Sequence, residues 1–485
     1  MNRTTPPAAP AFKDLPPRRS SAAGVRKDFV VSLAIVTPIL GGGYRARVPD
    51  DVDFIRVPTV RGHLRFWWRA LFAGRFENSA SLYEAETKLW GGPGGGPDKA
   101  PAVRSPVEVR IEVTDRGREE QGDIDPRTTD GAYVLFPARS ERTQGQMTRA
   151  PIPRRTGVTF KLTVTAPAED IAAVRDAVRA WILFGGYGGR TRRGLGGLTV
   201  TGPDAATWLP HPHKALDTEL KRLFGREVFA VGGPARQTPM LAGAALSTIG
   251  PVEDRGVTAW LTAVEALRFF RQGTPSKRER VPDAAAALPS AWARQPGFDP
   301  EPWRPSISNW PEADKIRRLA GRQLRTGPYS HTPRHNETPV WPRAGFGLPI
   351  VGRFQTNGRD GAHYHEPPAF TLKWREPIGR NEYRVRERLA SPLIIKALPL
   401  VGGHFVAIAL WLHRDSPAGE IVLQINDDEV PGSAAPFDAL AAPGEAPLFT
   451  ALAGKPTLRS AFLDWLALDS DVITVFPHRD GGEAP

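Results

Sequence analysis

The stretch that decides the fold runs from Ile171 to Thr201, where an apolar segment meets the loop Gly185-Gly-Tyr-Gly-Gly-Arg-Thr-Arg-Arg-Gly-Leu-Gly-Gly197. Apolar residues recur at helical spacing over residues 171–184, so we expect a helix there, followed by a short strand at residues 198–201. The loop has seven glycines and three arginines. Glycines can leave N–H groups open to anions, and arginine forks suit phosphate oxygens. The loop therefore predicts an anion-binding element, and a solvated turn is the alternative.

The spacing of the loop excludes two nucleotide-binding motifs. No Gly-x4-Gly-Lys-Ser/Thr sequence occurs, and a dinucleotide fingerprint would open a helix, whereas this loop follows one. The pattern Gly-x-Gly-x5-Gly-x-Gly is met by Gly186, Gly188, Gly194 and Gly196. We therefore expect the loop to contact a nucleic-acid backbone and not a free nucleotide.

The residues before this stretch predict an α+β unit. Expected strands cover residues 29–37, 107–113, 132–136 and 158–164, and expected helices cover residues 60–76 and 82–89. The order strand, helix, strand, strand, helix, strand is that of a ferredoxin-like (split βαβ) unit, which has one free sheet face. Such a face is where this fold usually binds RNA.

The whole chain divides into five parts. Residues 1–27 are rich in proline and arginine and predict a disordered basic arm, before a first domain at 28–203. Residues 204–306 predict a helical insertion, with a helix at 258–271, and a Pro-rich linker. Residues 307–474 predict a second mixed domain, with a helix at 314–324 and strands at 369–374 and 405–412. Residues 475–485 form a tail.

The composition favours a polyanionic partner. The 64 Lys and Arg exceed the 52 Asp and Glu, which gives a net charge of +12 and a pI of about 10.1. Nucleic acid and an acidic protein both fit this charge. The chain has no cysteine, which excludes disulfides and thiolate zinc sites, and no apolar run long enough to span a membrane. We expect a cytoplasmic protein with no membrane contact.

A second basic element lies in the helix expected after residue 60. Leu64, Trp67 and Trp68 share one face, which favours core packing over base stacking for the two tryptophans. Arg61, Arg65 and Arg69 recur every four residues on a neighbouring stripe, an arrangement that can follow phosphates. A solvated charged face is the alternative.

Histidines give weaker signals. His63 lies off the apolar face and could act as a general acid or base, although a lone histidine is more often a hydrogen-bonding residue. Three histidine pairs, at 211 and 213, 331 and 335, and 363 and 365, and the acids at 427–429, 469 and 471 have no rigid element to hold them. We therefore expect no metal site and no cofactor.

Several strings together resemble a known family. They are Thr37-Pro38, the string Arg56-Val-Pro-Thr-Val-Arg-Gly-His-Leu-Arg-Phe-Trp-Trp-Arg69 and the glycine loop, with further matches at 309–317, 346–349 and 388–395. They are similar to the RAMP superfamily of CRISPR systems, and most of all to subunits of the type III-B (Cmr) effector complex. The similarity extends from about residue 29 to about residue 412.

The resemblance implies two ferredoxin-like (RRM-like) RAMP domains with helical and loop insertions, facing each other across a basic cleft. It implies a non-catalytic RNA-binding subunit of a type III-B (Cmr) CRISPR effector ribonucleoprotein for antiviral defence. Such a subunit would cap the RAMP filament near the 3′ portion of the guide RNA, and hold guide and target RNA beside other RAMP subunits. Base pairing would then supply sequence specificity.

The RNA-contacting residues that this resemblance implies fall into two groups. Those of the first half are Arg56, Arg61, His63, Arg65, Arg69, Gly186, Gly188, Arg190, Arg192, Arg193, Gly194 and Gly196. Those of the second half are Arg317, Arg318, Arg343, Arg388 and Lys396.

Two other functions stay open from the sequence. Other RAMP proteins are endoribonucleases that process guide RNA, and in that case His63 would be the general base. A scaffold that meets only acidic protein partners is the third possibility.

Overall fold

The computed structural model describes residues 25–43, 53–93, 102–125, 128–143, 146–230, 237–272, 312–324, 336–354, 366–380, 382–437, 439–445 and 450–477. Most of the expected basic arm, of the Pro-rich linker and of the tail lies outside these residues. No helix among the described residues is long and apolar enough to cross a membrane.

The first half has the expected order of strands and helices. Its elements are β1 (Arg26–Ile35), α1 (Val57–Phe72), β3 (Glu108–Asp115), β8 (Thr159–Pro167), α4 (Ile171–Phe184) and β9 (Leu198–Val200). The strands form an antiparallel sheet in the order β3-β8-β1-β9. A further helix, α2 (Ser79–Trp90), packs beside α1 and begins at an Asn78 capping box.

The second half repeats this order. Its elements are β10 (Met240–Glu253), α6 (Gly256–Gln272), β14 (Leu393–Pro399), β15 (Phe405–His413), α10 (Leu458–Leu466) and β19 (Val472–Phe476). Their antiparallel sheet has the order β14-β15-β10-β19, which matches the first sheet position by position. The chain is thus an α+β protein with antiparallel sheets.

Two expectations were wrong in detail. Residues 240–272 were assigned to an insertion, but β10 lies inside the second sheet and α6 covers that sheet. Because β10 is buried on both faces, its sequence shows an apolar run and lacks the alternation that marks a half-exposed strand. Residues 132–136 form the short helix α3 (Ala132–Leu135) and the start of a 3-10 turn (Phe136–Ala138) in place of a strand, since brief apolar runs fit either structure.

Helix α1 starts at Val57, three residues before the expected start. Pro58 lies in its first turn, where the missing N–H removes no helical hydrogen bond. A proline that was interpreted as ending the preceding extended segment is therefore part of the helix.

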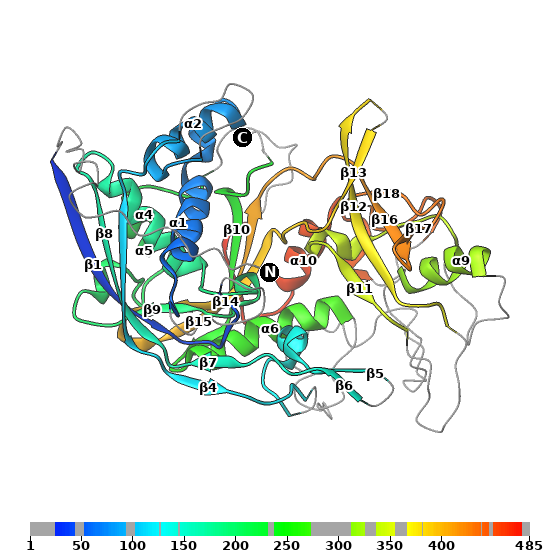
Figure 1. The fold of residues 1–485 in the computed structure, drawn as a ribbon, viewed down its shortest axis with the longest axis horizontal. Coiled ribbons are helices and arrows are strands. Elements are labelled where there is room, and N and C mark those ends of the chain that lie inside the picture. Colours follow the sequence, from blue (N-terminus) through cyan, green and yellow to red (C-terminus); the bar gives the residue numbers. More distant parts are fainter. Residues whose placement is uncertain are drawn as a thin grey trace, which may run out of the picture.

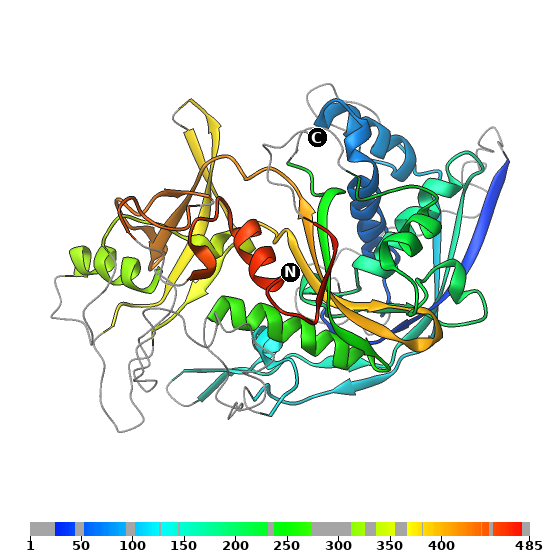
Figure 2. The same ribbon diagram turned by 180° about the vertical axis from the view of Figure 1, so that it is seen from behind.

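The two sheets and their helices form four layers (Figures 1 and 2). Helices α1 and α4 lie between the sheets, and one hydrophobic core joins Leu33 and Val164 of the first sheet to Leu246 and Ile408 of the second. Helices α6 and α10 cover the other face of the second sheet. The second sheet is consequently covered on both faces, whereas the first is covered on one.

The outward face of the first sheet does not provide a basic platform. Its strands direct Glu108 and Glu112 outward alongside Arg110 and Lys161, and no aromatic residue occupies an outward position on β1, β3 or β8. Sheets that bind RNA by stacking use aromatic residues at such positions. The expected free face is present, but its chemistry does not suit that role.

A third sheet lies beyond the second half. It is formed by β11 (Ile350–Gly352), β12 (Phe370–Gly379), β16 (Glu420–Ile425) and β17 (Asp428–Glu429), with β13 (Glu382–Arg386) and β18 (Ala435–Pro436) paired to it. Helix α9 (Glu312–Leu324) shares its core. The β12–β13 hairpin projects from the molecule (Figure 1).

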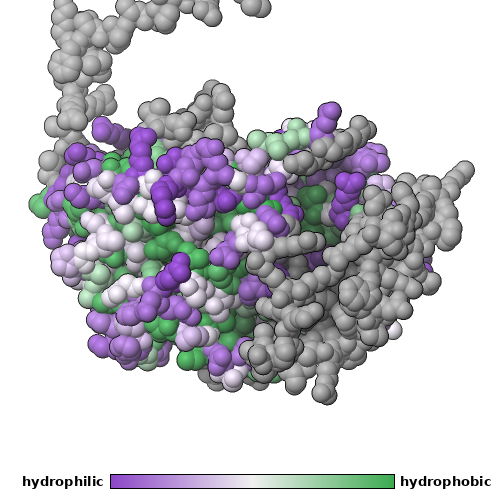
Figure 3. Space-filling model, turned by 90° about the horizontal axis from the view of Figure 1, so that it is seen from below, coloured by the Kyte–Doolittle hydropathy of each residue, from purple (hydrophilic) through white to green (hydrophobic). Residues whose placement is uncertain are grey.

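Smaller elements complete the fold. They are β2 (Ile39–Leu40), β4 (Arg118–Glu120) and β7 (Arg154–Thr156), which form one sheet, the hairpin of β5 (Glu141–Thr143) and β6 (Gln146–Arg149), and helix α5 (Leu216–Phe224). Viewed from below, the described surface shows apolar side chains between hydrophilic ones (Figure 3).

Candidate nucleic-acid interface

The glycine loop, residues 185–197, is packed between the two halves and is not an open turn. Gly188, Gly194 and Gly196 have φ of +92°, +77° and +63°. A Cβ on Gly196 would lie 1.8 Å from the Tyr187 carbonyl oxygen, and one on Gly186 would lie 2.9 Å from that of Gly196. These two positions require glycine because any Cβ would clash with a backbone carbonyl oxygen of the same loop. This steric constraint is stronger than a positive φ alone.

Several backbone groups of the loop are already hydrogen-bonded, either to each other or to the segment Thr37-Pro38. The N–H of Gly194 donates to Thr191 O at 3.0 Å and that of Gly196 to Pro38 O at 2.9 Å. The Thr37 hydroxyl donates to Gly194 O at 2.7 Å and accepts from Gly197 N at 2.7 Å. These N–H groups are therefore not open to anions, and Thr37-Pro38 is the segment that fixes the loop.

The arginines of the loop differ in exposure. Arg193 is buried and donates to Leu393 O at 3.1 Å and Phe346 O at 3.2 Å, both in the second half. Arg192 donates to Ser391 O, and its guanidinium lies 5.2 Å from the Phe66 ring centroid. Burial lowers the pKa of Arg193 to about 9 and that of Arg192 to about 10, so both stay cationic at neutral pH.

The phosphate contact expected for Arg193 stays a prediction that its burial disfavours, because its guanidinium bonds carbonyl oxygens inside the protein. Arg190 has a φ of +59° and is exposed, with its guanidinium 6.0 Å from the Phe136 ring centroid. It remains a candidate for a phosphate contact.

Lys396 also connects the halves from within. It is fully buried on β14, and its Nζ donates to Ile182 O at 3.0 Å and to Gly185 O at 2.9 Å, at the carboxyl end of α4. A cation is favourable there because the last carbonyl groups of a helix have no helical partner. Burial lowers the pKa of Lys396 to about 7. Lys396 thus bonds carbonyl oxygens of the protein in this structure, and the RNA contact expected for it stays a prediction that its burial disfavours.

The arginine stripe on α1 contacts neighbouring elements. Arg61 donates to Val107 O at 2.8 Å and Trp90 O at 2.7 Å. Arg65 donates to the buried Glu86 carboxylate at 2.7 Å, and Arg69 donates to the same oxygen. The side chains of Arg65 and Arg69 are still 28% and 32% exposed, so they can face a phosphate while they hold α2.

The remaining candidates are spread over the molecule. The backbone N–H of Arg56 donates to the Tyr187 hydroxyl at 2.9 Å. Arg317 is fully buried, pairs with Glu366 at 2.8 Å and has its guanidinium 4.2 Å from the Phe354 ring centroid. The RNA contact expected for it stays a prediction that this burial disfavours. Arg343 pairs with Glu312 at 3.4 Å. Arg318 is half-buried and Arg388 is exposed.

Helix α1 and the glycine loop do converge. They enclose a pocket of about 240 Å³, completed by one residue of β14. Its lining residues are His63, Phe66, Trp67, Phe184, Gly185, Gly186, Thr191, Arg192 and Ile394. None of them is acidic, and they come from both halves of the chain.

His63 lies in the wall of this pocket. Its ring stacks on Trp181 with centroids 6.1 Å apart, and its Nε2 is shielded from solvent with no hydrogen-bond partner among the described residues. Burial lowers its pKa to about 4, so the imidazole is neutral at pH 7. A neutral imidazole can donate one hydrogen bond and accept another, or accept a proton. Trp67 and Trp68 are buried, as core packing requires.

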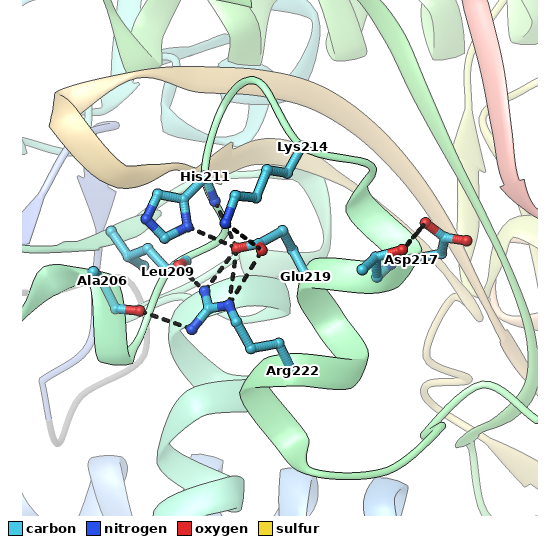
Figure 4. A network of polar contacts seen from close by, with 8 residues as sticks. Ala206, Leu209, His211, Lys214, Asp217, Glu219 and Arg222 are labelled. Atoms are coloured by element: carbon cyan, nitrogen blue, oxygen red, sulfur yellow. Dashed lines mark hydrogen bonds and ion pairs between the residues drawn. The ribbon is translucent and has the colours of Figure 1, made fainter.

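A second polar cluster is structural (Figure 4). The buried Glu219 carboxylate of α5 accepts from Arg222 at 2.7 Å and contacts His211 Nδ1 at 2.8 Å. Hydrogen bonds from Arg222, which outweigh the effect of burial, lower the pKa of Glu219 to about 2. His211 thus serves this ion pair. The pairs 331 and 335, and 363 and 365, lie outside the described residues, and the described part contains no group of three His, Cys, Asp or Glu placed to hold a metal ion.

Sequence reasoning missed several residues of the junction. The Tyr187 hydroxyl donates to Phe54 O at 3.1 Å and so anchors the loop to the start of α1. Ser391 and Leu393 supply acceptors for the loop arginines. Tyr187, the single aromatic residue of the glycine loop, was the one sequence signal for this junction, because a buried tyrosine usually packs its ring and hydrogen-bonds its hydroxyl.

Comparison with known proteins identifies relatives by sequence. Residues 32–199 match the family model described as the RAMP superfamily. The chain is 28% identical over 191 residues to the CRISPR system Cmr subunit Cmr1-2 of Pyrococcus furiosus, a match that covers 35% of this chain and 94% of that relative.

Solved structures also match. A crystal structure of Cmr1 from Pyrococcus furiosus, in its apo form, aligns with a TM-score of 0.45 and 15% identity, over 93% of this chain and 99% of that one. A cryo-EM structure of a type III-B Cmr-beta complex bound to cognate target RNA and AMPPnP contains a chain that aligns with a TM-score of 0.37 and 11% identity, over 79% of this chain and 94% of that one.

Proposed function

We propose that the chain is a non-catalytic RNA-binding subunit of a type III-B (Cmr) effector ribonucleoprotein, because residues 32–199 match the RAMP superfamily model and the chain is similar to Cmr1-2. In this role it caps the RAMP filament near the 3′ portion of the guide RNA. Its partners are guide RNA, target RNA and other RAMP subunits. One chain of the Cmr-beta complex, which was solved with cognate target RNA bound, is similar to this chain, and these partners are proposed from that similarity.

As part of the proposal, both halves are ferredoxin-like RAMP domains. Each has the order strand, helix, strand, strand, helix, strand, and each sheet has the same strand order. This connection order with antiparallel pairing is that of the ferredoxin-like unit.

The observation that carries the proposal is the junction between α1 and the glycine loop. Its pocket has Arg192 and no acidic residue in its lining. Arg65 and Arg69 on α1 are partly exposed, and Arg190 is exposed on the loop. The whole chain has a net charge of +12, which attracts a polyanion, whereas the outward face of the first sheet has mixed charges.

The non-catalytic part of the proposal rests on the pocket as well. Among the lining residues His63 is the one proton acceptor with a pKa below 7. No carboxylate and no second histidine lines the same pocket. Hydrolysis of RNA by acid and base catalysis needs a group that takes a proton and another that gives one. The alternative is a RAMP endoribonuclease that processes guide RNA with His63 as general base.

The test measures binding of the purified chain to a labelled single-stranded RNA by fluorescence anisotropy across a series of salt concentrations. We expect log Kd to rise linearly with log salt, with a slope of about 0.7 per neutralised phosphate. Arg190→Ala lowers that slope by about 0.7, whereas the matched control Arg110→Ala, on the outward sheet face, leaves it unchanged.

Two outcomes contradict the proposal. Affinity that is absent, or that does not change with salt, removes RNA binding and favours a scaffold for acidic proteins. Cleavage of guide-repeat RNA that His63→Ala abolishes, followed on a denaturing gel, replaces the non-catalytic role with the endoribonuclease.

A further inference from the structure

We propose that the pocket between α1 and the glycine loop receives one unpaired nucleobase of the bound RNA, stacked against Phe66 and Arg192. This inference rests on the RNA-binding function proposed above and names the part of the RNA that enters the site. At the place where the two halves meet, the protein would contact a base of the RNA and not its sugar-phosphate backbone.

The size of the pocket limits its occupant. Its volume is about 240 Å³. Sites for drug-sized ligands usually exceed about 300 Å³, so this pocket fits a single ring system better than a whole nucleotide.

The walls of the pocket are aromatic. The rings of Phe66 and Trp67 meet edge to face with centroids 5.1 Å apart, and Trp67 lies 6.0 Å from Phe184. Trp67 and Phe184 are buried, whereas Phe66 is half-buried. Phe66 is therefore the aromatic residue that an entering base can stack on.

The Arg192 guanidinium lies over this ring as a fixed planar cation, so a base can stack on the outer face of the guanidinium or on the other face of Phe66. The guanidinium lies 5.2 Å from the Phe66 ring centroid, and its Nη1 donates to Ser391 O of the second half. That hydrogen bond orients the guanidinium plane before any ligand arrives, so little side-chain freedom is lost on binding. Unstacked bases bind to such Arg planes as well as to aromatic rings.

His63 provides a polar group next to the aromatic walls. Its Nε2 has no partner among the described residues, although buried polar atoms usually have one. The edge of a nucleobase has both donors and acceptors, and a neutral imidazole can use either. The polar edge and the stacking face of a base match the two kinds of group that line this pocket.

A phosphate fits the same place less well. The N–H groups of Gly185, Gly194, Gly196 and Gly197 are already used within the protein. Arg192 is the one cation that lines the pocket, and it is bonded inward. A phosphate between apolar walls would lose its hydration without enough donors to replace it. The phosphates would then face the exposed Arg190 outside the pocket.

The test compares a short single-stranded RNA with versions in which one base at a time is replaced by an abasic site. We expect loss of one particular base to weaken binding of the full chain by roughly 5- to 100-fold, and loss of the others to have less effect. Phe66→Leu should remove this difference, because leucine keeps the packing volume but has no aromatic face.

Two further variants keep the test decisive. Phe76→Leu is the matched control, since Phe76 is also half-buried near α1 and contacts Trp68 but does not line the pocket. It should keep the full sensitivity to the abasic site. Arg192→Lys keeps the charge and loses the planar face, so the salt slope should persist while the sensitivity falls. Circular dichroism of each variant verifies the fold.

The outcomes separate the two proposals. RNA that binds with salt dependence but shows equal affinity for every abasic version overturns the base pocket and leaves the RNA-binding function intact. Equal loss of sensitivity in Phe66→Leu and Phe76→Leu also overturns the pocket. No RNA binding by the unmodified chain overturns both.

Discussion

The glycine loop and the β12–β13 hairpin are both rich in arginine, yet their arginines contact different kinds of acceptor. In the loop, Arg192 and Arg193 point inward and donate to carbonyl oxygens of the second half. In the hairpin, Arg375 pairs with Glu420 at 2.5 Å and Arg384 is exposed. Arginine content alone therefore does not distinguish residues that hold the fold from residues available to RNA.

The difference follows from the acceptors around each segment. The loop passes between the two halves, where carbonyl groups at the ends of elements lack partners and a buried guanidinium can satisfy several at once. The hairpin extends into solvent, where carboxylates or water satisfy its arginines and each pair contributes little.

The largest expected effect comes from the backbone contact in the loop. Gly196→Ala should lower the free energy of unfolding by about 3–5 kcal/mol, because its Cβ would lie 1.8 Å from Tyr187 O and no side chain can move away to relieve the clash. Gly432→Ala is the matched control, since Gly432 has a similar φ of +73° but nothing within 4 Å of its Cβ. We expect a cost of about 1 kcal/mol there, measured by urea denaturation. Equal costs at both positions would show that the loop is less tightly packed.

The next effect distinguishes the two sets of arginines. Arg193→Ala should lower the free energy of unfolding by about 2–4 kcal/mol, because it removes the donor to the buried Phe346 O and one of the two donors to Leu393 O, which keeps only the Ser391 hydroxyl. Arg384→Ala in the hairpin should change it by less than about 0.5 kcal/mol. A large loss at Arg384 would contradict the contrast between the segments.

The third effect depends on pH. The pKa of Lys396 is lowered from its ordinary 10.5 to about 7 in the folded chain, so between pH 7 and 10.5 the unfolded chain binds more protons. Stability should therefore rise with pH across this window, by on the order of 1 kcal/mol per pH unit, and be lowest below it. Lys396→Met should remove this rise when both proteins are unfolded in urea at each pH. The same slope in both proteins would exclude Lys396 as its source.

The smallest effect concerns RNA. Arg388 is exposed just after the hairpin, so Arg388→Ala should weaken RNA binding uniformly and lower the salt slope by about 0.7 if it meets a phosphate. Its stability should not change. An unchanged slope would restrict the RNA path to the first half and the junction.

Much of the first half could be predicted, because its pattern is local. The helix at 171–184 was predicted to the residue, since its apolar period and the glycine that ends it are both sequence signals. The second half was harder. β10 is covered on both faces and its partner β15 lies far along the chain, so neither its alternation nor its neighbours reveal a strand.

The site was predictable in part. A common cleft for the glycine loop and α1 was implied only by the family resemblance. Residues of both do line one pocket, but of their arginines only Arg192 lines it. The sequence could not predict which arginines face outward. That depends on carbonyl groups some two hundred residues away along the chain, such as Ser391 O for Arg192. The same holds for Lys396, whose burial depends on the end of α4.

The position of α1 and α4 between the two sheets has a consequence for how the chain can be divided. Their apolar side chains pack against Leu246, Ile394 and Ile408 on one side as well as against the first sheet on the other. A fragment that ends after β9 would expose that second face to water, at a cost proportional to its apolar area. We therefore expect the first half, cut off after β9, to be less stable than the same residues within the whole chain, despite the matching topology of the two halves.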